Sequence, residues 1–185
     1  MIFAYDKDRI YFAFDKYDID EDPAFFPYYY KNPTEENLPC WHPHDGMLIY
    51  VSSPNARITD LIRYYVKIPT EISFVYAEEL YRAITDLLKR NGYETFESKD
   101  YWVVIANSVE GYRISGGGVI DRLEHDGMLG GGNRIISDSV SKEEIPPLEA
   151  IKEYFRKEHS YIDRKNDSII VMNTAESGVQ IVELD

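Results

Sequence analysis

The thiol, imidazole and carboxylate side chains that could ligate a metal gather around a repeated pentapeptide. His-Asp-Gly-Met-Leu occurs at 44–48 and again at 125–129, and a cysteine and a further histidine precede the first copy. Structural zinc sites use four such ligands, but in other spacings. Two similar Asp-Gly turns are therefore the preferred interpretation. A metal site is the alternative, and its ligands would be Cys40, His42, His44, His125 and Asp126.

Two other stretches could supply a nucleophile or an anion site. Ser52 and Ser53 precede Pro54, but no acid or base lies near them in the sequence. A serine before a proline is typical of a helix start, which explains both residues without catalysis. Residues 129–133 are glycine-rich but lack the lysine and hydroxyl of a phosphate-binding loop. We interpret them as a site of close backbone packing.

The elements that would position these residues are strands and helices in a mixed order. Residues 1–5 and 10–15 predict a hairpin, because apolar residues alternate along the second segment. Helical spacing predicts a helix that Ser53 caps and a second one that Ser73 caps, ending near Gly92. Strands are expected at 47–51, 101–106, 112–115, 119–120, 168–173 and 178–184, and a further helix at 147–159.

Residues 18–44 fit none of these elements and predict an irregular insertion. Five aromatic side chains lie close together in it, namely Phe25, Phe26, Tyr28, Tyr29 and Tyr30. They would suit a surface that binds a protein partner or a second copy, because aromatic rings supply large contact area. The alternative is that the rings fill the core of their own domain.

Composition restricts the class of protein and its partners. The chain has 185 residues, enough for one domain with its own core, and its formal net charge is -13. This charge opposes binding to nucleic acid or to an anionic membrane surface. The single cysteine fits a reducing compartment, and no apolar run approaches the ~20 residues of a membrane span. We expect a cytoplasmic protein without a cofactor.

Residues 101–133, YWVVIANSVEGYRISGGGVIDRLEHDGMLGGGN, carry the clearest resemblance to a known family. They predict a buried strand, two short strands and a glycine-rich loop, in that order. Together with the elements on either side, this order resembles that of the proteasome β-subunit family and its HslV-like members. The resemblance implies an α+β fold over residues 1–185, a four-layer αββα sandwich of two antiparallel sheets flanked by helices, as in N-terminal nucleophile hydrolases. It also implies a homo-oligomer, because family members form stacked rings.

The same resemblance implies a site at the start of the chain whose catalytic groups are missing. The family's nucleophile is an N-terminal threonine, whereas Met1 stands here and no Ser, Thr or Cys precedes Thr34. Asp15 corresponds to an aspartate that supports a catalytic lysine, although a solvated strand end or turn acceptor is its simpler interpretation. Gly131 stands at the family's serine. We therefore expect a vestigial site of Met1, Asp15 and Gly131, and no catalytic residue.

Three functions remain open from the sequence. The first is a proteasome-like protein without peptidase activity that acts by self-assembly or protein binding. The second is an acidic inhibitor or decoy, of the phage anti-defence or immunity type, that binds a basic partner through charge and aromatic anchors. The third is a hydrolase with an unrecognised centre.

Overall fold

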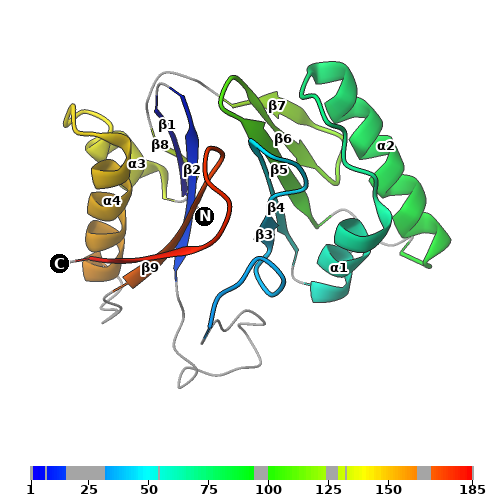
Figure 1. Cartoon of the computed structure of the whole chain (residues 1–185), viewed down its shortest axis with the longest axis horizontal. Helices are drawn as coiled ribbons and strands as arrows, with labels where there is room; N and C mark the ends of the chain where they lie inside the picture. The colour runs from blue at the N-terminus through cyan, green and yellow to red at the C-terminus, as the bar shows by residue number, and fades with distance from the viewer. Residues whose placement is uncertain are drawn as a thin grey trace. The chain divides into compact units, whose positions relative to one another are not determined.

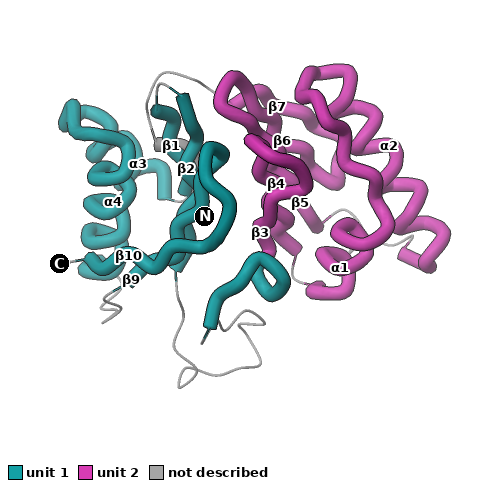
Figure 2. The backbone as a smooth tube through the Cα atoms, in the orientation of Figure 1, with its two compact units in different colours: residues 1–38, 124–185 teal, residues 39–123 magenta. Residues whose placement is uncertain are grey.

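The computed structural model describes residues 2–6, 8–15, 32–53, 55–93, 100–123, 129–131, 133–161 and 168–184. The backbone divides into two compact units, which Figure 2 colours separately. Unit 1 comprises residues 1–38 and 124–185, and unit 2 comprises residues 39–123. The aromatic cluster at 25–30, together with His125 and Asp126, lies outside the described residues.

Unit 1 is an antiparallel sheet with helices on one face (Figure 1). The strand order is β10-β9-β2-β1-β8. The strands are β1 (Ile2–Tyr5), β2 (Ile10–Asp15), β8 (Leu129–Gly131), β9 (Ser168–Asn173) and β10 (Gln180–Glu183). Two helices, α3 (Arg134–Val140) and α4 (Pro147–Tyr161), accompany the sheet. The predicted N-terminal hairpin is present, and the two strands predicted near the C-terminus pair with each other.

The core of unit 1 forms where the sheet meets α4. Alternate residues of the strands point to this face, since the side-chain period of a strand is two. They pack against the apolar stripe of the helix. The buried members include Ile2, Ala4, Ala13, Ile169 and Val171 from the sheet, with Ala150, Ile151, Tyr154 and Phe155 from α4 and Val140 from α3.

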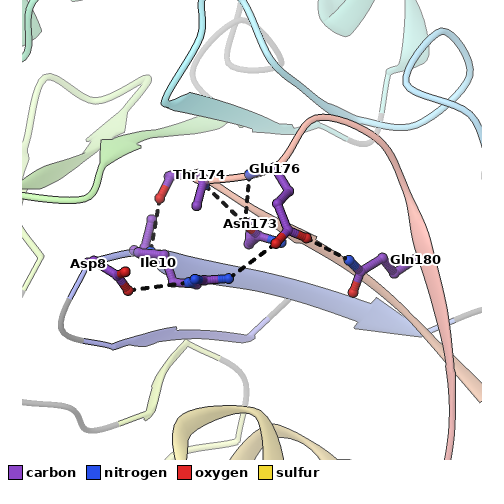
Figure 3. A network of polar contacts seen from close by, with 8 residues as sticks. Asp8, Ile10, Asn173, Thr174, Glu176 and Gln180 are labelled. Atoms are coloured by element: carbon purple, nitrogen blue, oxygen red, sulfur yellow. Dashed lines mark hydrogen bonds and ion pairs between the residues drawn. The ribbon is translucent and has the colours of Figure 1, made fainter.

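Polar contacts join the turn between β1 and β2 to the end of β9 (Figure 3). The backbone N–H of Ile10 donates to the buried hydroxyl of Thr174 at 3.0 Å. Arg9 lies 3.3 Å from the carboxylate of Asp8 and 3.5 Å from that of Glu176. Solvent screening weakens such exposed ion pairs, so the buried backbone bond is the firmer link.

Unit 2 is a second antiparallel sheet with its own helices. The strand order follows the chain, β3 (Cys40–Trp41), β4 (Met47–Ser52), β5 (Trp102–Asn107), β6 (Gly111–Ser115) and β7 (Ile120–Arg122). Helices α1 (Ala56–Tyr65) and α2 (Phe74–Arg90) pack their apolar faces on it. Ile58 and Ile62 of α1 and Ile84 and Leu88 of α2 are among the fully buried side chains.

Of the two predicted helix caps, the one for α2 is confirmed and the one for α1 is wrong. The Ser73 side chain accepts from the N–H of Tyr76 at 3.3 Å, as predicted for α2. The cap of α1 is Asn55, whose side chain accepts from the N–H of Arg57 at 3.0 Å, so the prediction of Ser53 was wrong. Ser53 instead accepts from the N–H of Asn55 at 3.1 Å and shapes the turn before the helix.

Two segments predicted as loops form short strands. Leu129–Gly131 is not a loop but pairs with β1, so backbone hydrogen bonding compensates for the weak strand preference of glycine. Cys40–Trp41, expected within the irregular insertion at 18–44, pairs with β4, and both side chains are buried. The short polar stretch after Asn133 folds as α3.

The predicted α+β class, with two antiparallel sheets and helices against them, is confirmed. That residues 1–185 form one domain stays a prediction. Within the described ranges, every helix is too short or too polar to cross a membrane.

Candidate functional site

Strand pairing brings the start of β1 next to the predicted site residues. Ile2 lies opposite Ala13 of β2 on one side and opposite Gly131 of β8 on the other. The glycine-rich segment therefore adjoins the beginning of the chain, as the resemblance implies. Met1 itself lies outside the described residues.

Strand β1 presents core residues at this position. Ile2 and Ala4 are 1% and 0% exposed and belong to the core against α4. The four residues of β1, Ile-Phe-Ala-Tyr, include no serine, threonine or cysteine. In its described part, the strand thus offers no aliphatic hydroxyl or thiol that a neighbouring base could activate.

Asp15 is buried and bound to a histidine. The Asp15 side chain accepts a hydrogen bond from Nε2 of His159 at 2.5 Å, and the two residues are 7% and 4% exposed. Asp15 faces α4 because it lies two residues after Ala13 on the same side of β2. The interpretation of Asp15 as a solvated strand end or turn acceptor was therefore wrong. Burial of a carboxylate requires such a partner.

His159 was missed by the sequence analysis. It lies four residues after Phe155 and eight after Ile151, so it continues the buried stripe of α4. The ring of Phe155 lies 5.9 Å from that of His159, which fixes the imidazole beside the aspartate. A histidine on the apolar face of a helix was the available signal, but nothing local pointed to Asp15 as its partner.

Tyr154 connects the glycine-rich segment to the same helix. Its hydroxyl accepts from the N–H of Asn133 at 2.6 Å and donates to Glu158 at 2.7 Å. Burial is the main cause that raises the pKa of Tyr154, and the carboxylates of Glu158 and Asp15 raise it further. The phenol therefore stays protonated and serves as a fixed hydrogen-bonding bridge.

This arrangement connects the end of β2 with the start of α3, and its Asp15, Tyr154 and His159 side chains are buried. An aspartate that orients a histidine supplies two of the three members of a nucleophilic triad, and the third must be a nucleophile at the other ring nitrogen. Asp15 and His159 lie in the core of unit 1, and α4 contributes both Tyr154 and His159. We interpret the cluster as a buried polar network that orders the β2 end and the start of α3.

The described members of the predicted metal site form no cluster of ligands. Nε2 of His44 lies 3.0 Å from the carbonyl oxygen of Ile68, and Cys40 is buried in β3. Among the described residues, no three His, Cys, Asp or Glu side chains are grouped as metal ligands. Ser52 ends β4 and Ser53 precedes the cap of α1.

Comparison with known proteins identifies the fold. A scan against protein-family models finds no match, and a search of the curated proteins finds none. Among solved structures, BPH of Thiobacillus denitrificans superposes with a TM-score of 0.65 at 11% identity, covering 100% of this chain and 97% of that one. The structure of that protein in complex with epoxomicin gives the same TM-score at 12% identity.

Two further structures place the chain in the same fold. HslV of Trypanosoma brucei gives a TM-score of 0.57 at 14% identity, covering 93% of this chain and 97% of that one. The Anbu complex of Pseudomonas aeruginosa, solved as a helical assembly, gives 0.57 at 11% identity, covering 100% and 86%. The chain therefore has a proteasome-like fold, as the resemblance implied.

Proposed function

We propose that this chain is a proteasome-like protein without peptidase activity that acts through self-assembly or protein binding. The observation that carries the proposal is the burial of Asp15 against His159 beside a first strand made of core residues. Covalent catalysis needs a nucleophile, a base and oxyanion donors within about 3 Å of one reacting atom.

The glycine-rich segment supports the same conclusion. Gly131 pairs with Ile2 through the backbone, where the resemblance implies a serine hydroxyl. The adjoining Asn133 N–H, which could have faced a substrate, donates to Tyr154. The Asn133 N–H and the Tyr154 hydroxyl are thus both engaged within the fold.

Self-assembly is proposed from the fold together with an exposed aromatic surface. The Pseudomonas aeruginosa protein of the same fold forms a helical assembly. In this chain, Tyr64 and Tyr65 at the end of α1 are 68% and 73% exposed, although each carries a large apolar ring. Exposed tyrosines of this kind are enriched in protein interfaces.

The solution mass tests the assembly half of the proposal. Native mass spectrometry of the chain, 21.6 kDa as a monomer, is expected to show a discrete multimer. Replacing both tyrosines, Tyr64→Ser with Tyr65→Ser, should lower its population, whereas Tyr161→Ser, at an exposed position of α4, should not. A strictly monomeric chain at micromolar concentration would refute self-assembly.

A second candidate is an acidic inhibitor or decoy of a basic protein. The net charge of -13 favours it, since such a surface steers a cationic partner. Affinity capture at low and at high salt separates the two proposals. A stoichiometric partner that is lost at high salt supports the inhibitor, and a salt-resistant homomultimer supports the first proposal.

A further inference from the structure

Unit 2 contains a cavity that the proteasome-like site does not involve. Its volume is about 650 Å³, within the range of small-molecule sites. It lies between residues 41–44, the connection from α1 to α2, and the exposed flank of α2. Trp41, Val66 and Leu80 supply buried apolar lining, and they are 8%, 8% and 3% exposed.

One wall of the cavity is built from the Trp-His-Pro-His stretch and is held in place by two contacts. The guanidinium of Arg63 lies 4.1 Å from the centroid of the Trp41 ring. Nε2 of His44 lies 3.0 Å from the carbonyl oxygen of Ile68, and because a carbonyl only accepts, Nε2 carries the proton. These contacts fix the wall against the end of α1, so the cavity is preformed.

Charges of both signs surround this apolar lining. Lys67, Glu71 and Glu79 all line the cavity and are exposed. They form no ion pair with any residue of the described ranges. Arg63, in the last turn of α1, stacks on Trp41. In a chain of net charge -13, the lining holds two cationic and two anionic side chains.

We infer that this cavity binds a small zwitterion with an apolar body, namely an apolar α-amino acid or a short peptide. The carboxylate of the ligand would bind Lys67, and its ammonium group would bind Glu71 and Glu79. Its apolar side chain would pack on the surface of Trp41 and Leu80. A simple anion would be repelled by the two carboxylates and a simple cation by Lys67. Because these charges are solvent-exposed, the dissociation constant is expected on the order of 0.1–1 mM.

The fluorescence of Trp41 reports on the cavity directly. The chain has two tryptophans, so Trp102→Phe leaves Trp41 as the only indole. We expect a saturable fluorescence change with L-leucine or with glycyl-leucyl-glycine. The compound that binds more tightly shows whether the cavity takes a free amino acid or a short peptide. N-acetyl-leucinamide, which has the same side chain but no charge, should not bind. Calorimetry on the unmodified chain repeats the test without the substitution.

Charge variants test the orientation of the ligand. Lys67→Met and Glu79→Gln should each raise the dissociation constant about threefold to tenfold. Lys89→Met and Glu183→Gln, which change exposed residues outside the cavity, should leave it unchanged. The inference is overturned if no zwitterion saturates by about 20 mM, if N-acetyl-leucinamide binds equally well, or if neither cavity variant weakens binding. These outcomes do not depend on the proposed function.

Discussion

Removal of His159 is expected to destabilise unit 1 strongly. His159→Ala would leave Asp15, only 7% exposed, without the imidazole that it now binds at 2.5 Å. Loss of one partner of a buried pair costs about 3–5 kcal/mol, because the remaining charge stays desolvated. Asp15→Ala removes the acceptor from a buried imidazole and should cost about 1–3 kcal/mol.

The double variant separates the interaction from the loss of packing. Asp15→Ala with His159→Ala should be at least about 1 kcal/mol less destabilised than the sum of the single variants, since it removes both members of the pair at once. For a chain of this length, His159→Ala should lower the melting temperature by about 6–20 °C. Urea unfolding followed by far-UV circular dichroism is the suitable assay. Both tryptophans lie in unit 2, so their fluorescence reports on the other unit.

A neighbouring position supplies the control. Ser160→Ala changes the exposed residue next to His159 and should alter the unfolding free energy by no more than about 0.5 kcal/mol. A loss below about 1 kcal/mol in His159→Ala, or strict additivity in the double variant, would refute the reasoning. Either result would mean that the pair is not buried as described.

Three further changes probe the local structure through urea unfolding. Asn55→Ala removes the cap of α1 and should cost about 1 kcal/mol. Gly118→Ala should cost about 1–2 kcal/mol, because Gly118 has φ +87 and a Cβ there would lie 3.1 Å from the Tyr81 hydroxyl. Gly117→Ala is its control, since a Cβ there meets nothing closer than 3.7 Å. Burial raises the pKa of Tyr101 to about 12, because it disfavours the charged phenolate. The contribution of the neutral phenol to the unfolding free energy is therefore complete below the unfolded-state pKa of about 10 and is lost as pH rises towards 12. At pH 11.5 the part of the loss due to Tyr101 is about 2 kcal/mol, so Tyr101→Phe should lose about that much less stability than the unmodified chain.

The local elements could be predicted because each has a short-range physical cause. The alternation of Ile10, Phe12 and Phe14 specifies a strand, and Ser73 caps a helix whose apolar face follows directly. The cap of α1 was misassigned because Ser53 and Asn55 are both capping residues on either side of Pro54. Only the folded backbone shows that the asparagine side chain reaches the first turn.

The polar network could not be predicted because its members are distant in the sequence. Asp15 and His159 are 144 residues apart, and β2 and α4 bring them together. Likewise, Leu129–Gly131 has little intrinsic strand preference and becomes a strand through pairing with β1. His44, considered as a metal ligand in the sequence, lines a cavity together with Trp41, and the other walls of this cavity come from the helices of unit 2.

Intact mass spectrometry after incubation with epoxomicin tests the central proposal most directly. BPH of Thiobacillus denitrificans, which shares the fold and has been solved in complex with this compound, is the positive control. We predict that this chain keeps its unmodified mass under conditions in which BPH binds epoxomicin. A stoichiometric covalent adduct on this chain would contradict the proposal, because it would reveal a reactive nucleophile.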